Sequence, residues 1–297
     1  MPRLKTARWA GVRAPDAARA AADEPSKPVR LGYHAQLWID RDFLLTIVRA
    51  RALFLRGNLA AGIALAQEVT ARASEINHQQ PLMLTMGLAA CPIALWSGDW
   101  ELAAELIDRF KRHIARYSAP HYHEQWAHGY DRALHLCAKG TVGPSPDGCY
   151  HTLVQDHLCT VHEVFVTPEA LARAQAGQAG WCAPEIFRGH GNRLWRGGAE
   201  SQGEALLRKA IRLAQRQGAR FWALRAATDL AVRLRGANRE MEALQILKPA
   251  YTAFASGPQV FDVRRAGSLW AELDAQASDN GPSAGRRRQV DRINVSA

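Results

Sequence analysis

The sequence predicts an all-α protein built from repeated pairs of helices. Three observations carry this prediction. Between residues 31 and 140, Gly and Pro are sparse, Ala, Leu, Arg and Glu dominate, and apolar residues recur at spacings of three and four. Gly or Asn follows several of these apolar stretches, and the same helix, turn and helix pattern then recurs along the chain. Hydrophobic residues make up 47% of the 297 positions, which is enough to bury a large core.

The helices follow one another closely. The first is expected in WIDRDFLLTIVRARALFLRGN, where Phe43, Ile47, Ala50 and Phe54 share one stripe and Gly57-Asn58 ends the helix. The second, LAAGIALAQEVTARASEIN, begins at once. The pattern recurs in ALWSGDWELAAELIDRF, LHLCAKG and NRLWRGGAESQGEALLRKAIRLAQ and, with Asn for Gly, in VRLRGANREMEALQILKPAY. Each of these segments predicts two helices joined by a tight turn.

Aligning the chain on the turns shows a repeat. The turn residues are Gly57, Gly98, Gly140, Gly198 and Asn238, at intervals of 41, 42, 58 and 40. Seven residues before each turn the residue is always small: Ala50, Cys91, Ala133, Gly191 and Ala231. Five residues after each turn it is small again: Gly62, Ala103, Ser145, Gly203 and Ala243. Small residues at both columns let paired helices approach closely, which predicts a tetratricopeptide-like α-solenoid of about five antiparallel pairs with a period longer than the usual ~34 residues.

The long interval marks an irregular unit. GTVGPSPDGCYH interrupts the third repeat, and TPEALARAQAGQAGWCAPE predicts a short helix bracketed by Pro and Gly. The expected organisation is a disordered basic tail at 1–30, a helical repeat domain at 31–277 that is irregular at 141–180, and a disordered basic tail at 278–297. FDVRRAGSLWAELDAQ fits a C-terminal cap of the array.

Charge and cysteine content limit the function classes. The net charge is +10, but residues 1–30 carry +4 and residues 278–297 carry +2 of it. The basic arms RLKTAR and RRRQVDR make a nucleic-acid-binding module one alternative, although no recognition helix or interleaved aromatic pattern accompanies them. Five Cys residues without a CxxC pair favour a reducing compartment. No apolar run of 18 residues and no signal-peptide core are found, so we expect a cytoplasmic protein without a membrane segment.

The C-terminal part resembles a known class of protein. GEALLRKAIRLAQRQGARFWALRAATDLAVRL, followed by EALQILKPAYTAF, is similar to the tetratricopeptide-like C-terminal region of large bacterial regulators, and MGLAACPIALWSGDWELAAEL looks like an upstream repeat of that region. In those regulators the region follows a P-loop ATPase module and a winged-helix or nucleotide-cyclase domain. This chain contains no GxxxxGK(S/T) sequence, so no ATP- or DNA-binding residue carries over. The resemblance implies a sensor or scaffold part, stand-alone or truncated.

Two His-rich and Cys-rich patches raise the alternative of a metal-dependent enzyme. His121, His128 and His135 share a helical face, but ligands seven residues apart on a helix lie about 10 Å apart, too far for one ion. The second patch, CYHTLVQDHLCTVHE, has spacings that match no common zinc site. No GxSxG elbow and no acid/base pair are evident. We therefore expect no catalytic residues, no metal and no cofactor.

The predicted function is a non-catalytic module that binds a protein or an effector. In such arrays the first helix of each pair faces the groove, which gives five candidate groove residues: Gln36, His128, Asp131, Arg188 and Arg225. We expect a protein partner, with a P-loop ATPase or a winged-helix regulator as the named candidates. Direct binding of nucleic acid is not expected, and the sequence leaves the oligomeric state open.

Overall fold

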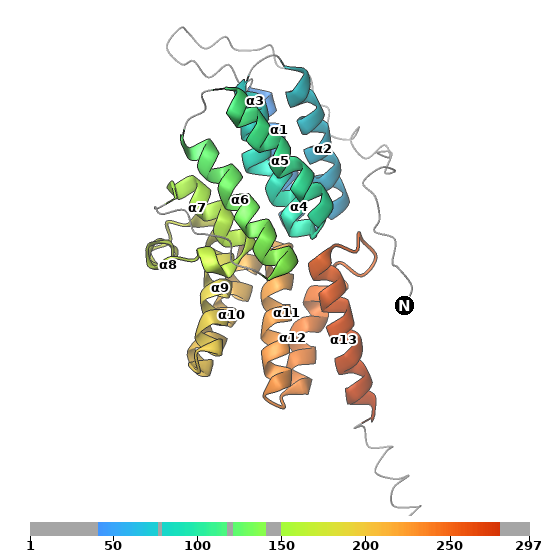
Figure 1. Ribbon diagram of the computed structural model, residues 1–297. Coiled ribbons are helices and arrows are strands. Elements are labelled where there is room, and N and C mark those ends of the chain that lie inside the picture. Colours follow the sequence, from blue (N-terminus) through green and yellow to red (C-terminus); the bar gives the residue numbers. More distant parts are fainter. Residues whose placement is uncertain (1–40, 77–78, 118–120, 141–149, 280–297) are drawn as a thin grey trace, which may run out of the picture.

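Every regular element in the described part of the chain is helical. The computed structural model describes residues 41–76, 79–117, 121–140 and 150–279, and the predicted all-α class is confirmed over these ranges (Figure 1). The N-terminal half contains α1 (Arg41–Leu55), α2 (Leu59–Glu75), α3 (Gln79–Thr85), the π-helical turn η2 (Met86–Ala90), α4 (Cys91–Ser97), α5 (Trp100–Arg116), α6 (His121–Lys139) and α7 (Thr152–Val161).

The C-terminal half is arranged below it in Figure 1. It contains α9 (Ala183–Arg196), α10 (Glu200–Arg216), α11 (Arg220–Gly236), α12 (Glu240–Thr252) and α13 (Phe261–Asp279). Three short elements link the halves: η3 (Glu163–Phe165), α8 (Pro168–Gln175) and η4 (Gly180–Cys182). Helices adjacent in sequence pack most extensively, above all α1 with α2, α9 with α10 and α11 with α12.

The predicted turns lie where the sequence puts them. All five turn residues have a positive φ, from 58° at Asn238 to 98° at Gly57, the left-handed conformation that ends a helix. The small column before each turn is buried at all five positions. The column after each turn is buried at Gly62, Ala103, Gly203 and Ala243, whereas Ser145 lies outside the described residues. Gly218 makes a further turn, between α10 and α11, that the alignment did not include.

The small columns allow the paired backbones to touch. A Cβ added to Gly62 of α2 would lie 2.7 Å from the backbone nitrogen of Phe54 in α1. A Cβ added to Gly203 of α10 would lie 2.8 Å from the carbonyl oxygen of Gly191 in α9. Both distances are too short for a real carbon, so these two pairs require glycine.

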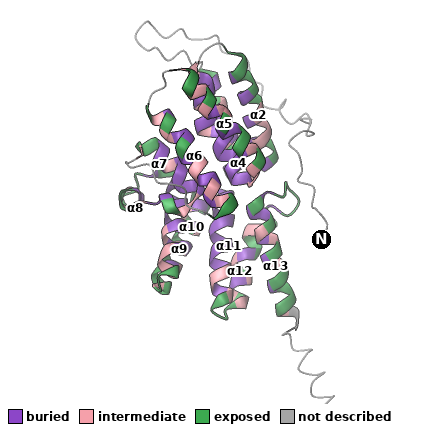
Figure 2. Cartoon of the chain, viewed as in Figure 1, coloured by how far each residue is buried: buried purple, intermediate pink, exposed green. Residues whose placement is uncertain are grey.

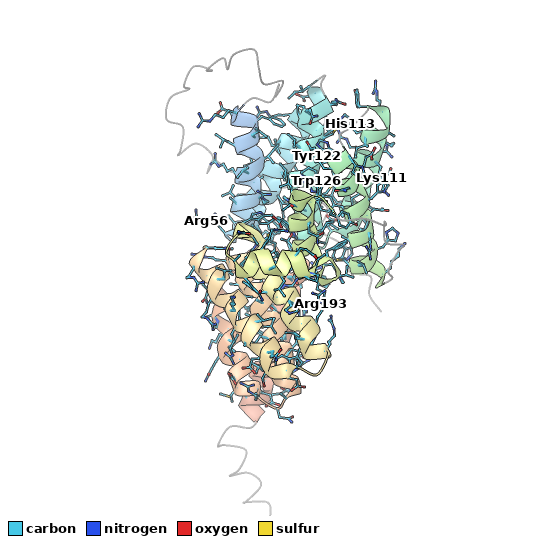
Figure 3. The ribbon with its side chains drawn as sticks, turned by 90° about the vertical axis from the view of Figure 1, so that its left-hand side faces the viewer. Arg56, Lys111, His113, Tyr122, Trp126 and Arg193 are labelled. Atoms are coloured by element: carbon cyan, nitrogen blue, oxygen red, sulfur yellow. The ribbon has the colours of Figure 1, made fainter. Side chains whose placement is uncertain are left out.

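The central helix of the N-terminal half runs through α3, η2 and α4. Pro92 would clash with a regular helical turn before it, and the π-helical turn at Met86–Ala90 accommodates the missing N–H. Gly87 in that turn lies under the ring of Trp126 and accepts a 2.6 Å hydrogen bond from the Tyr130 hydroxyl. Figure 3 shows Trp126 beside Tyr122 among these helices. Gln79–Ser97 is long and apolar enough to cross a membrane, yet 83% of that window is buried inside the protein, as in the core helix of a soluble protein.

The described part of the irregular unit, residues 150–180, is largely helical. The short helix that the sequence predicts near residue 168 is α8, with Thr167 capping it through a 3.2 Å bond from the Ala170 amide. Residues 150–165 add α7 and η3. Residues 141–149 lie outside the described ranges, as do the predicted tail at 1–30 and positions 280–297 of the second tail. The segment that the sequence predicts as a C-terminal cap forms the helix α13, which extends two residues into that second tail, to Asp279.

Aromatic rings fill the junction between the two halves. The ring centroids of Phe54 in α1 and Phe221 in α11 lie 4.8 Å apart, and those of Trp96 in α4 and Trp222 in α11 lie 5.1 Å apart. Both pairs are arranged edge to face. The Trp96 indole N–H donates to the Thr160 hydroxyl of α7 at 3.1 Å. Every residue from 221 to 230 is buried, so α11 is the central helix of this junction (Figure 2). The two halves therefore share one core.

We expect Gly203→Ala to destabilise the protein by about 1–3 kcal/mol, because the added methyl group forces α9 and α10 apart. Gly236→Ala is the matched control: nothing lies within 4 Å of its added Cβ, and this position is helical without positive φ. Urea unfolding of both variants measures the difference. Equal midpoints for the two variants would contradict the close approach.

Acid should weaken the fold through His157. Burial, and then Arg51, lower the pKa of His157 from its ordinary 6.5 to about 3. The unfolded chain binds this proton below about pH 6.5 and the folded chain does not, so stability is lost as the pH falls from 6.5 towards 3, at about 1.4 kcal/mol per pH unit. Between pH 7 and 4.5, the unfolding free energy of His157→Gln should therefore fall by about 2.5 kcal/mol less than that of the wild type. The exposed His128→Gln is the control and should follow the wild-type profile.

Candidate functional site

A polar cavity of about 330 Å³ opens where the two halves meet. Its walls come from α4, α5, α6, α7 and η3 on one side and from α9, α11 and α13 on the other. It is rich in charge, with five guanidinium groups among its lining residues: Arg188, Arg196, Arg225, Arg233 and Arg265. Three carboxylates also line it: Glu163, Asp229 and Asp262. The cavity thus gathers side chains that lie far apart in the sequence.

Arg188 holds the centre of a buried ion network. Its Nε lies 2.9 Å from Glu185 Oε1, one helical turn back on α9, and its Nη1 lies 2.6 Å from Asp229 Oδ2 on α11. Glu185 is fully buried, and Arg188 is 8% exposed. Asn192, one further turn along α9, donates to the same Asp229 oxygen at 2.6 Å. The network therefore ties α9 to α11.

Arg225 and Arg265 extend the network to α13 and α7. Arg225 Nη1 lies 2.5 Å from Glu185 Oε2 and 2.6 Å from the Thr160 carbonyl oxygen at the end of α7. Its Nε is 3.1 Å from Asp262 Oδ2 on α13. Arg265, also on α13, pairs with Asp229 Oδ1 at 2.8 Å. Three carboxylates and three guanidinium groups thus compensate one another across α9, α11 and α13, and Arg225 also binds the end of α7.

The network stabilises the charged forms of Asp229 and Arg188. Burial alone would raise the pKa of Asp229, but Arg188, Arg265 and the Asn192 hydrogen bond outweigh it and hold that pKa far below its usual value. Burial alone would lower the pKa of Arg188, but Glu185 and Asp229 outweigh it and raise that pKa. Pairing of this kind is what a buried charge requires.

Neutral polar groups complete the cavity. Burial raises the pKa of the Cys137 thiol to about 11, so it holds its proton and is a poor nucleophile at neutral pH. Burial lowers the pKa of His162, which is therefore a neutral imidazole. Its Nδ1 accepts the Val164 amide at 3.2 Å, which leaves the ring proton on Nε2. The arrangement can bind and orient a polar molecule, but it presents no activated nucleophile among these groups.

The structure brings together two of the five groove residues that the sequence predicts. Arg188 and Arg225 both line the cavity and share Glu185 as a partner. Asp131 lies elsewhere, paired with Lys111 at 2.7 Å between α6 and α5, where it lines a second cavity of about 430 Å³. Lys111 is labelled in Figure 3. His128 is exposed on α6 and lines neither cavity, and Gln36 lies outside the described residues.

The His and Cys patches have other contacts. His157 is buried, with Nε2 2.6 Å from the Arg51 guanidinium and Nδ1 2.8 Å from the Leu153 carbonyl oxygen. His121 pairs with Glu124 on the surface, and Cys149 lies outside the described residues. Within the described ranges, no three His, Cys, Asp or Glu side chains are placed to hold a metal ion. The geometry gives the metal-dependent alternative no support.

Sequence reasoning missed Glu185, Asp229, Asp262 and Arg265. One signal was available. Arg225 and Asp229 lie four residues apart in WALRAATDLAV, a helix that is otherwise apolar on all sides. Such a helix is buried, and a charged pair on it needs partners from neighbouring helices. Arg265 and Asp262, three residues apart on α13, offer a similar pair. The identity of the partners could not be read from spacing.

We expect Asp229→Asn to destabilise the protein by about 3–5 kcal/mol, because it leaves the Arg188 and Arg265 charges poorly compensated beside a buried site. Glu272→Gln is the control, since it removes an exposed partner of Arg235 and should change stability by less than about 1 kcal/mol. Chemical denaturation at pH 7 compares the two. A loss below 1 kcal/mol in Asp229→Asn would show that the network contributes little.

Comparison with protein-family models, with curated proteins and with solved structures gives no match to this chain. The likeness to the C-terminal region of bacterial regulators therefore remains an expectation from the sequence.

Proposed function

We propose that the chain is a non-catalytic, tetratricopeptide-like module that binds a small effector in the polar cavity between its two halves. One observation carries the proposal: seven α-helices and the short helix η3, from both halves, contribute side chains to a single cavity beside a fixed network of ion pairs. A ligand in that position would contact both halves at once, which suits a sensor.

The repeat character supports the module part of the proposal. Helices adjacent in sequence pack on one another, and glycine-sized contacts recur at equivalent places in two pairs, at Gly62 and at Gly203. Left-handed turn residues occur at every aligned turn. These are features of helical-hairpin arrays, in which each unit buries its apolar face against the next.

The volume and chemistry of the cavity support a small effector rather than an extended peptide. About 330 Å³ lies at the lower end of the range of small-molecule pockets, ~300–1,000 Å³. The charges of the buried network are already paired before a ligand enters, so binding costs little reorganisation of these side chains. Apolar walls from Leu95, Leu136 and Val161 sit beside the polar groups.

A protein partner would distinguish the effector-bound form of the module from the free form. We propose a P-loop ATPase or a winged-helix regulator acting in trans, because the chain has no phosphate-binding loop of its own. The basic arms RLKTAR and RRRQVDR lie outside the described residues, so the nucleic-acid alternative gains no structural argument.

The effector site can be tested by filling it. Val232 of α11 is half-buried and lines the cavity, so Val232→Trp should occupy the space without changing any charge. In a thermal-shift screen against a library of small metabolites, we expect at least one compound to raise the Tm of the wild type and to have no effect on Val232→Trp.

Ile246→Trp is the matched control, because Ile246 is half-buried on α12 and lines neither cavity. It should respond as the wild type does. If every compound that stabilises the wild type also stabilises Val232→Trp, the effector does not bind in this cavity and the proposal fails.

A further inference from the structure

The charges of the cavity do not balance within the described residues. Four carboxylates face or underlie it: Glu163, Glu185, Asp229 and Asp262. Glu163 pairs with Arg196 at the rim. The other three carboxylates share Arg188, Arg225 and Arg265, as described above. Five arginines therefore face four carboxylates, and one guanidinium remains.

The remaining guanidinium belongs to Arg233. It lies on α11, two turns beyond Arg225, is half-buried and lines the cavity. No carboxylate among the described residues lies within ion-pair distance of it. A cation held in a partly dry cavity without a counter-ion favours an anionic ligand, and a guanidinium suits the fork of a carboxylate.

A second, independent group points to the ligand. Asn192 is 5% exposed, and its Nδ2 is used by Asp229, but its Oδ1 has no hydrogen-bond partner. A buried acceptor without a donor costs free energy that a ligand O–H or N–H would recover. His162 adds a donor through Nε2–H, because its Nδ1 is occupied by the Val164 amide.

The wall beside these groups is aromatic. Trp100 of α5 and Phe261 of α13 line the cavity with ring centroids 5.8 Å apart. Phe261 is 43% exposed, so part of this cavity-lining side chain is open to a ligand. A flat aromatic ring of a ligand would pack against the Phe261 ring.

From these three features we infer that the cavity binds a small aromatic carboxylic acid carrying one hydrogen-bond donor. The carboxylate pairs with Arg233, the donor reaches Asn192 Oδ1, and the ring packs on Trp100 and Phe261. This inference rests on the proposed function, since it assigns the chemistry of the same effector site.

The chemical class can be tested with four probes of nearly equal size. They are 4-hydroxyphenylacetate, its neutral amide 4-hydroxyphenylacetamide, the cation tyramine, and phenylacetate, which lacks the hydroxyl donor. By isothermal titration calorimetry on the full chain, we expect 4-hydroxyphenylacetate to bind at least tenfold more tightly than the amide or tyramine. Phenylacetate should bind several-fold more weakly than 4-hydroxyphenylacetate, because it leaves Asn192 Oδ1 without a donor.

Arg233→Gln should bring the affinity of 4-hydroxyphenylacetate down to that of the amide while leaving the amide unaffected. The variant should fold, because Arg233 takes no part in the buried network. Arg212→Gln, an equal change of charge at an exposed position on α10, is the control and should bind as the wild type does.

Each other outcome overturns the inference in a recognisable way. If the amide or tyramine binds as tightly as the acid, and Val232→Trp still abolishes that binding, the ligand class is wrong although the cavity is a binding site. If Val232→Trp leaves binding of the acid intact, the proposed effector site falls as well. If no probe binds, the aromatic-acid class is excluded, and the metabolite screen decides the proposed function separately.

Discussion

The pairing of Arg188 with Glu185 and Asp229 is the constraint on which the rest of the C-terminal half depends. Glu185 is fully buried, and a carboxylate in that position is tolerated only with cations at hydrogen-bond distance. Arg188 and Arg225 supply them from α9 and α11, and Asp262 and Arg265 bring in α13. The relative placement of three helices is therefore fixed by charge as well as by apolar packing.

This network also explains why the cavity is where it is. Apolar contacts, such as Phe54 with Phe221 and Trp96 with Trp222, close the junction on one side. On the other side, the paired charges of Arg188, Arg225 and Arg265 line the cavity, and the hydrogen bond from Arg225 to the Thr160 carbonyl oxygen links them to α7. A ligand at this position would contact the helices that the network holds in place. Binding could therefore shift the conformation of both halves.

The sequence predicts the local features better than the distant ones. Turns and small columns are readable because left-handed residues and close backbone approach demand particular residue types at fixed spacing, as at Gly57 and Gly203. Arg188 and Arg225 were predicted as groove residues because they lie on the first helix of a pair. The same rule also predicted His128, which is exposed. What spacing cannot supply is pairing between distant segments: Glu185 and Arg225 lie 40 residues apart, and which helix faces which follows only from the packed fold. The unbalanced charge of Arg233 is a property of that packing.

Buried carboxylates hold Arg188, whereas Arg233 has no carboxylate partner among the described residues. Arginine side-chain NMR on protein labelled with ¹⁵N-arginine tests this difference, with resonances assigned from single Arg→Lys variants. We expect slow exchange of the Arg188 guanidinium protons with water and restricted rotation of its terminal nitrogens, alongside fast exchange at Arg233. Exchange at Arg188 as fast as at Arg233 would contradict it.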